Sequence, residues 1–254
     1  MGKQKADVTL CLLVGRDYAT HIHSFEALGV EKRLIEDELV LSDYEKEYGY
    51  FVDNIQVYII VALMNGCDSR IADYFSRITD DILVFKEGVS EGTAYNEMFR
   101  RVDTEWVCII QPNVFVKRFW LSDLIFYGKI IPRSGAIGFS ENLNDTKFLP
   151  MLSTEDEILI NVFIPDNNTL DTRGIWLFNK QNLYFVGAFT EEKEMLGMEM
   201  THWQLRALAI GLTNYYIPTH SCLIVSSPTP VREGDAMEKS LKEMKKARNY
   251  YLPL

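Results

Sequence analysis

Short apolar runs recur along the first half of the chain, and most are followed directly by a polar or turn residue. One run covers Val8–Val14 and stops at Gly15, and others cover Ile55–Val61, Ile82–Phe85 and Trp106–Ile110. A segment that is apolar at both even and odd positions is typical of a strand buried on both faces of a sheet. These runs therefore predict central strands.

Helical spacing of apolar residues separates these strands. Ser69–Ile78 fits a helix, and Glu91–Val102 places Ala94 and Met98 on one face of another. The order strand, helix, strand, helix, strand predicts a parallel sheet with right-handed crossovers and helices on both faces. The interval between the first two strands is longer than one crossover helix needs, so we expect an insertion or a second helix near 42–52.

The second half of the chain continues with mixed elements and shows no domain boundary. The polar segment 140–172 contains the apolar run Ile158–Ile164, which is typical of an antiparallel excursion. Asp235–Tyr250 fits an amphipathic helix that packs on the rest of the chain or on a partner. The other predicted elements are helices at Trp120–Tyr127 and Glu199–Ala209, and strands at Gly135–Phe139, Arg173–Phe178, Asn214–Ile217 and Cys222–Val225.

Composition and charge exclude several classes of protein. The 254 residues are 47% apolar and 24% charged, an ordinary globular make-up, and the formal charge of −10 argues against a nucleic-acid partner. No apolar run approaches the roughly 20 residues that span a bilayer, and the N-terminus lacks a signal segment, so we expect a cytoplasmic protein. The four cysteines lack metal-type spacing, and no phosphate-binding loop, GxGxxG or nucleophile elbow is present.

Two segments at predicted strand ends favour contacts to a phosphorylated ligand. Gly92–Asn96 lies where a loop becomes a helix, and the backbone N–H groups of such a helix start approach phosphate or sugar oxygens, with Asn96 holding the loop. Gln111-Pro112-Asn113 follows a strand, where open α/β sheets bind ligands. The local alternatives are a capped helix start, with Glu91 favouring the helix dipole, and a polar turn.

The side chains at the second of these segments are neutral. A Mg²⁺ or Mn²⁺ ion that bridges a diphosphate requires hard anionic oxygens, whereas Gln111 and Asn113 offer only amide carbonyls. His21 and His23 have no third ligand nearby. The sequence therefore predicts no metal ligand set, and a Mg²⁺ or Mn²⁺ site stays an alternative.

A carboxylate and a histidine lie on nearby turns at the start of the predicted helix Glu199–Ala209. Glu199 has the apolar Met200 and Trp203 beside it, and partial desolvation suits a carboxylate that takes a proton from an acceptor hydroxyl. His202 is the alternative base. The structural alternative is that Glu199 caps the helix and His202 packs or faces solvent.

The order of these segments resembles the GT-A fold of family 2 glycosyltransferases over residues 8–226. The resemblance implies an α/β fold with a mostly parallel central sheet, helices on both faces and a site for a nucleotide-diphospho-sugar. In the first half, Val8–Val14 resembles the first strand, Ile55–Met64 with Asn65-Gly66 resembles the strand and turn that cradle the base, and Gly92–Asn96 resembles the segment ahead of the donor-site helix. Trp106–Asn113 with Trp120-Leu121 resembles the metal-binding strand end and the next helix. Arg173–Phe189 resembles the acceptor-side strand and turn, and Glu199–Arg206 with Gly211 resembles the acidic pair, the arginine and the glycine.

Departures from the family pattern fall where the chemistry is expected. The base-binding aspartate falls near Met64, with Asp68 as the nearby substitute, and the metal-binding aspartates fall on Gln111 and Asn113. The second member of the acidic pair, usually the catalytic base of the family, falls on Met200.

We expect one domain over 1–254, with a nucleotide-binding half at 8–113, an acceptor half at 114–227 and a C-terminal helix at 228–254. The first functional hypothesis is an inverting, hexosyltransferase-like enzyme that transfers a sugar from a nucleotide-diphospho-sugar to an unidentified acceptor without a metal. The second is a catalytically inactive relative that binds or assembles partners, with an oligomer contact through the C-terminal helix.

The resemblance and the residue chemistry together assign roles to named positions. The candidate catalytic residues are Glu199 and His202. The candidate cations for the departing diphosphate are Arg16, Arg100, Arg101, Arg173 and Arg206. The candidate residues that bind the nucleotide-sugar are Gly15, Asn65, Asp68, Gly92, Asn96, Gln111, Asn113 and Arg206.

Overall fold

The computed structural model of the chain describes most of the predicted elements. The described residues are 6–15, 18–34, 48–64, 67, 69–111, 114–139, 146–152, 159–165, 174–192, 198–217 and 223–224. The predicted C-terminal helix Asp235–Tyr250 lies outside them.

Four parallel strands form the N-terminal half of the sheet, in the order β5, β4, β1, β6. Their bounds are β1 Val8–Val14, β4 Ile55–Leu63, β5 Asp81–Val84 and β6 Trp106–Ile110. In register, Leu10 of β1 pairs with Ile59 on one side and Cys108 on the other. The apolar runs therefore become the central strands, as the sequence predicted.

Antiparallel strands extend this sheet on both sides, so the described strands form one mixed, 11-stranded sheet. Beyond β6 come β11, β8, β12, β10 and β9, and only β8 and β12 pair in parallel. Their bounds are β8 Ser134–Gly138, β9 Thr146–Leu152, β10 Leu159–Pro165, β11 Ile175–Asn179 and β12 Thr213–Tyr216. The predicted antiparallel excursion near 158–164 is confirmed as β10 paired with β9.

The long interval between β1 and β4 contains a helix and two strands. The helix is α1 Tyr18–Ala27, and the strands are β2 Glu31–Leu34 and β3 Tyr48–Val52. β2 pairs with β3 and β3 pairs with β4, all antiparallel. The described part of the insertion expected near 42–52 therefore forms an edge of the sheet. A separate two-stranded sheet joins β7 Val114–Phe115 to β13 Leu223–Ile224.

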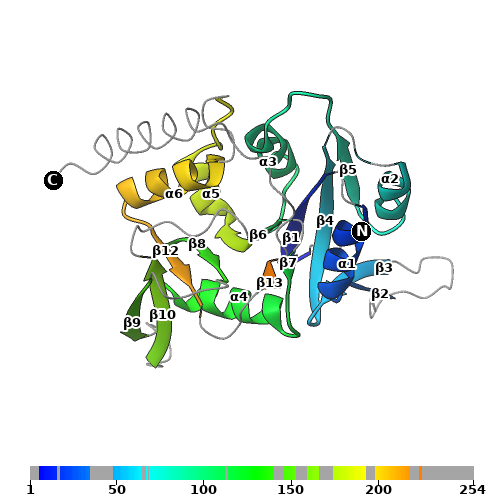
Figure 1. Cartoon of the computed structure of the whole chain (residues 1–254). Coiled ribbons are helices and arrows are strands. Elements are labelled where there is room, and N and C mark those ends of the chain that lie inside the picture. The colour runs from blue at the N-terminus through cyan, green and yellow to red at the C-terminus, as the bar shows by residue number, and fades with distance from the viewer. Residues whose placement is uncertain are drawn as a thin grey trace.

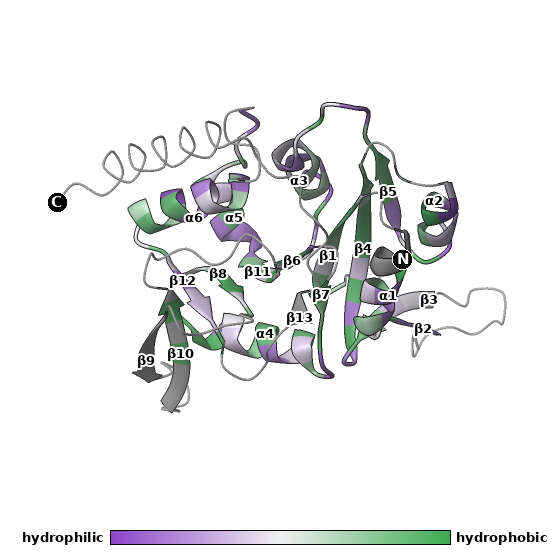
Figure 2. Ribbon diagram, in the orientation of Figure 1, coloured by the Kyte–Doolittle hydropathy of each residue, from purple (hydrophilic) through white to green (hydrophobic). Residues whose placement is uncertain are grey.

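Helices cover both faces of the sheet, as predicted (Figure 1). Even-numbered residues of β1 such as Leu12 pack in one apolar cluster with α1, α2 and α4, and odd-numbered residues such as Leu13 pack in a second cluster with α3, α5 and α6. Figure 2 shows hydrophobic residues along the central strands. The bounds are α2 Ser69–Phe75, α3 Glu91–Phe99, α4 Trp120–Ile130, α5 Lys180–Val186 and α6 Glu199–Ala209.

None of the helices in the described part of the chain has the length and apolar character needed to cross a bilayer.

Candidate functional site

The carboxyl ends of β1, β4, β5 and β6 meet at one edge of the sheet, because these strands are parallel. Gly15 follows β1 and Gln111 follows β6, while the loop after β5 leads into α3, where Gly92 lies in the first turn. Three of the predicted ligand-binding residues thus share the edge at which open α/β sheets bind ligands. Asn65, Asp68 and Asn113 lie outside the described residues.

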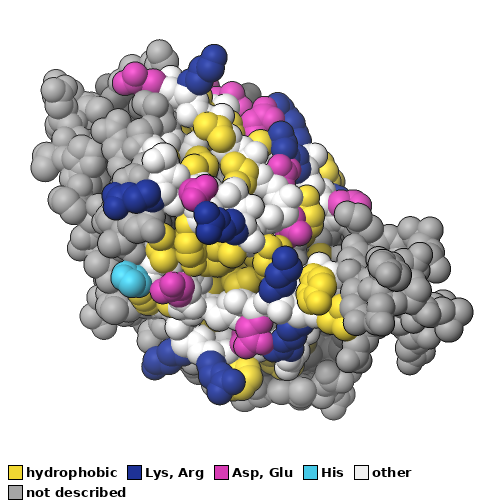
Figure 3. Space-filling model, turned by 90° about the vertical axis from the view of Figure 1, so that its right-hand side faces the viewer, with side chains coloured by type: hydrophobic (Ala, Val, Ile, Leu, Met, Phe, Trp, Pro, Cys, Tyr) yellow, Lys and Arg dark blue, Asp and Glu magenta, His cyan; other side chains and the backbone are white. Residues whose placement is uncertain are grey.

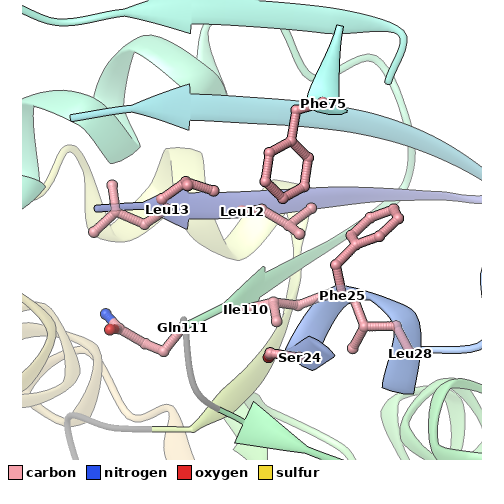
Figure 4. Close-up of a pocket in the computed structure, with 9 residues that line it drawn as sticks. Leu12, Leu13, Ser24, Phe25, Leu28, Phe75, Ile110 and Gln111 are labelled. Atoms are coloured by element: carbon pink, nitrogen blue, oxygen red, sulfur yellow. The ribbon is translucent and has the colours of Figure 1, made fainter. Parts of the chain in front are cut away.

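A small apolar pocket lies beneath this edge (Figure 4). Its cavity volume is only about 10 Å³, and Leu12, Phe25, Phe75 and Ile110 face one another across it. Gln111 lies to one side of this group in Figure 4. Pockets for small molecules usually measure roughly 300–1,000 Å³, so this one has no room for such a ligand.

Gln111 is held by two residues of α3 that the sequence analysis did not identify. Its Nε2 donates to the Tyr95 hydroxyl over 2.5 Å and to Glu91 Oε2 over 3.4 Å. Tyr95 is buried, and this burial, followed by the negative charges of Glu91 and Glu199, raises the pKa of its hydroxyl well above the ordinary value. The i, i+4 spacing of Glu91 and Tyr95 was the available signal, because it puts both on one helix face.

The contacts of Gln111 show whether its side chain suits a metal ion at the end of β6. Gln111 carries no charge, and its amide N–H group points at a tyrosine and a carboxylate. Hard divalent cations prefer anionic oxygens, so the Gln111 side chain does not fit the role of a metal ligand. Within the described residues, no group of three or more His, Cys, Asp or Glu side chains could hold a metal ion.

Asn96 joins α3 to a loop that is distant in the sequence. Its Nδ2 donates to Phe189 O over 3.0 Å and to Glu191 Oε1 over 2.8 Å, and its Oδ1 accepts from Phe189 N over 2.8 Å. The sequence analysis expected Asn96 to hold the loop at the start of its own helix. In the structure it fixes residues 189–191 instead, so its contacts are those of a positioning residue.

Gly92 lies where α3, the loop 189–191 and α6 come closest. A Cβ atom added at Gly92 would lie well inside van der Waals contact with the carbonyl oxygen of Thr190, and 3.1 Å from Glu199 Cγ. The helix start is also capped, because Ser90 Oγ accepts from Thr93 N over 3.1 Å. Gly92 is therefore needed for close packing, and the predicted capped helix start is present as well.

Glu199 belongs to the same group of residues. It is the first residue of α6, its side chain touches the position of Gly92, and its charge acts on Tyr95. Only 2% of its surface is exposed. The structure thus brings Glu199 together with Gly92 and, through Tyr95, with Gln111, although these residues are far apart in the chain.

His202 lies one turn further along α6 and is half-buried. Burial lowers the pKa of its imidazole below 6.5, and the nearby Arg206 cation lowers it further. Its Nδ1 is buried and has no hydrogen-bond partner among the described residues. Of the two candidate bases, Glu199 is the one with contacts to the strand-end group.

The described candidate arginines are engaged away from the strand ends. Arg206 donates to Val186 O over 3.3 Å and also to Ala188 O, which ties α6 to the end of α5. Arg100 pairs with Glu97 on its own helix, and Arg101 pairs with Asp81 over 2.7 Å. The nucleotide-sugar contact predicted for Arg206 stays a prediction, and Arg16 and Arg173 lie outside the described residues.

Replacing His202 by glutamine is expected to reduce the loss of stability at low pH. Because the folded state lowers the pKa of His202, the unfolded chain gains the proton first as pH falls through about 6.5. The contribution of neutral His202 to the stability of the folded state is therefore full above that pH and is lost below it. Urea unfolding at about pH 7.5 and about pH 5.5 should show a drop in unfolding free energy that is smaller in the variant, by less than about 1.4 kcal/mol.

The exposed His23, on α1, provides the control for this measurement. His23→Gln removes one imidazole at a site that contacts Glu26 over 3.3 Å. If both variants changed the pH dependence equally, burial of His202 would not be the cause.

Comparison with known proteins identifies the fold. No protein-family model matches the chain, and no curated protein sequence matches it. Solved structures do match. One is a mannosyltransferase, PcManGT from Pyrobaculum calidifontis in complex with GDP-Man and Mn²⁺. It is 13% identical with a TM-score of 0.56, and the match covers 98% of this chain and 64% of that one. S. aureus TarS 1-349 in complex with UDP-GlcNAc is 9% identical with a TM-score of 0.60, over 96% and 65%.

A third similar structure is GalNAc-T7 with UDP, GalNAc and Mn²⁺, 7% identical with a TM-score of 0.57, over 98% of this chain and 50% of that one. The chain thus spans half to two thirds of the length of these proteins. At such identities the likeness shows the fold, which is the α/β fold of GT-A glycosyltransferases, as the sequence predicted.

Proposed function

We propose that this protein binds a nucleotide-diphospho-sugar at the carboxyl ends of β1, β4 and β6 and transfers the sugar to an acceptor hydroxyl. The observation that carries the proposal is the meeting of Gly92, Gln111 and Glu199 around Tyr95 at this edge. The similar structures include complexes with GDP-Man and with UDP-GlcNAc, which supports this ligand class. A cytoplasmic location stays a prediction from the sequence.

Glu199 is the proposed general base. Its carboxylate takes the proton from the acceptor hydroxyl, and the oxygen then attacks the anomeric carbon from the face opposite the diphosphate. The bond between that carbon and the diphosphate oxygen breaks, and the diphosphate leaves with the electron pair, so the anomeric centre is inverted. Proton transfer of this kind is worth about 10²–10⁴ in rate.

Gly92 and Asn96 act as positioning residues in this proposal. Gly92 lets the loop 189–191 approach α3, and the three hydrogen bonds of Asn96 keep that loop in place. The start of α6, which carries Glu199, packs against the same glycine. The base is thereby held at the strand ends.

The departing diphosphate needs positive charge, and we propose that arginine supplies it in place of a metal. Two of the similar structures hold Mn²⁺, but the neutral Gln111 does not fit a Mn²⁺ ligand. Since Arg100, Arg101 and Arg206 are engaged elsewhere, Arg16 and Arg173 are the remaining candidates from the sequence.

A second candidate function is binding or assembly without transfer. The neutral end of β6 and the engaged arginines favour it, because both leave the diphosphate without a described countercharge. Contact of partners through the C-terminal helix 228–254, and the division into halves at 8–113 and 114–227, remain proposals.

Calorimetric titration with UDP, GDP, UDP-GlcNAc and GDP-mannose tests donor binding. We expect heat of binding with at least one of the four, and an affinity that Mn²⁺ changes by less than about threefold. Absence of heat with all four would overturn the proposed function. An affinity at least about tenfold higher with Mn²⁺ would overturn only its metal-independent part.

A further inference from the structure

A second pocket lies at the opposite edge of the sheet from the candidate site. Its cavity volume is about 160 Å³, and Asn54, Arg33, Lys117, Arg118 and Phe119 are among the residues that line it. The turn 53–54 directly precedes β4, which places this pocket at the amino ends of the parallel strands. In Figure 1 the beginning of β4 and the beginning of α4 lie at the same lower end of the molecule.

Three cations and two carboxylates line this pocket, which gives it a small positive charge, whereas the chain as a whole carries −10. Both carboxylates on it are engaged: Glu31 accepts from Arg33 Nε over 2.8 Å, and Asp53 accepts from the backbone N–H groups of Phe119 and Leu121 over 3.0 and 3.1 Å.

Lys117 and Arg118 make no ion pair among the described residues. Figure 3 shows Lys and Arg side chains together with Asp and Glu side chains around hydrophobic ones on one face of the molecule. We call Arg33, Lys117, Arg118 and Phe119 the basic tip.

Phe119 is exposed to solvent and has a strained backbone conformation. Its side chain is 58% exposed, and its φ of 67° lies in the left-handed region, which is unfavourable for a residue with a Cβ atom. The Asp53 carboxylate fixes this conformation through the N–H of Phe119, and the Arg118 guanidinium lies 5.7 Å from the ring centroid. Glycine would occupy this position with less strain, so stability does not explain the aromatic ring.

Strands β2 and β3 carry further aromatic and basic residues near this pocket. Arg33 of β2 donates to Asn54 Oδ1 over 2.8 Å, which joins β2 to the tip. On β3, the 57% exposed Tyr48 has the Lys32 ammonium 5.8 Å from its ring centroid. Because Lys32 and Arg33 are consecutive in β2, their side chains lie on opposite faces, and the pair of Lys32 and Tyr48 is separate from the tip.

We propose that the basic tip docks this protein on the surface of an anionic phospholipid bilayer. Lys and Arg side chains bind lipid phosphates while their alkyl chains stay in less polar surroundings, and aromatic rings favour the boundary between headgroups and acyl chains. Protruding rings suit a broad, fluid surface better than an acidic peptide, which needs a groove or a strand edge.

Negative charge that is distant from the tip has little effect on this contact. Charges more than about 8 Å from the bilayer are largely screened at physiological salt, so the local charge of the tip decides binding. Because the tip lies at the amino ends of the strands, docking leaves their carboxyl ends, and the candidate site, facing away from the lipid.

Flotation of the full chain with vesicles tests the proposal. Vesicles of phosphatidylcholine alone are compared with vesicles that also contain about 30% phosphatidylglycerol, at about 50 mM and about 500 mM salt. We expect at least about fivefold more bound protein on the anionic vesicles at low salt, and loss of this difference at high salt. No binding to the anionic vesicles would overturn the proposal.

Variants locate the contact. Lys117→Glu together with Arg118→Glu should abolish the difference, whereas Lys86→Glu, at an exposed position in the loop after β5, should retain it. Phe119→Gly should bind several-fold less while its melting temperature stays the same or rises, because the left-handed backbone is relaxed.

The C-terminal cluster Lys242, Lys245, Lys246 and Arg248 lies outside the described residues and is another source of positive charge. If the Lys117 and Arg118 variant bound vesicles as well as the native chain, or if Lys86→Glu lost binding equally, the tip would not be the docking surface. Binding of polyglutamate to the tip with no binding of vesicles would likewise overturn the proposal, in favour of an acidic protein partner.

Discussion

Replacing Glu199 by glutamine is expected to lower the release of free nucleotide from UDP-GlcNAc or GDP-mannose by about 100- to 10,000-fold. The amide keeps the shape of the side chain that packs against Gly92, but it cannot accept the proton of the attacking hydroxyl. Donor affinity should change little, because the base acts on the acceptor. The measurement is nucleotide release over time at saturating donor, beside a calorimetric titration of the same variant.

Glu192→Gln is the matched control for this substitution. Glu192 is exposed on the loop that follows Thr190, and its replacement removes one carboxylate without touching Gly92 or Tyr95. Equal losses in both variants would contradict a specific role for Glu199. If the native chain bound a donor but released no nucleotide under any condition, the binding function would replace the transferase function.

Replacing Gly92 by alanine is expected to destabilise the fold by about 1–3 kcal/mol, as overpacking does elsewhere. In an open helix the same change would stabilise by up to about 1 kcal/mol, so the sign of the effect reports the contact with Thr190. The added methyl group must push the loop 189–191 away from α3, which strains the hydrogen bonds of Asn96 to Phe189 and Glu191. Urea unfolding at neutral pH measures the change.

A functional effect should accompany this loss of stability. The start of α6 packs against Gly92, so Gly92→Ala displaces Glu199 and should lower nucleotide release even where the variant remains folded. A variant as stable and as active as the native chain would show that the loop and α6 adapt freely, and that the site does not depend on this close approach.

The strands of the parallel half were predictable because their apolar runs are unbroken. Trp106–Ile110 was predicted from the sequence and forms β6 with the same bounds, since every residue in it is buried. The helix predicted over Glu91–Val102 ends at Phe99 as α3, and Val102 still packs in the same cluster as Ala94 and Met98. Helix ends depend on a few local hydrogen bonds and are less constrained by the apolar pattern.

The site was predictable in position but not in its connections. Gly92, Gln111 and Glu199 were singled out as residues after strands or at helix starts, and the structure brings them together. The partner of Asn96 was not predictable, because Phe189 lies 93 residues away and nothing local specifies it. The contacts of Arg206 to carbonyl groups at the end of α5 were not predictable either, and its assignment to the ligand, made by resemblance, stays a prediction.

By itself the sequence determined which segments are buried strands, and hence which residues lie at the carboxyl edge of the parallel strands, because burial on both faces leaves a continuous apolar run. The tertiary structure decided what those edge residues contact. Gln111 binds Tyr95, Gly92 makes room for Thr190, and Asp53 fixes the backbone of Phe119. These contacts join segments far apart in the chain, and short-range hydrogen bonds and close packing are set only when the layers of the fold come together.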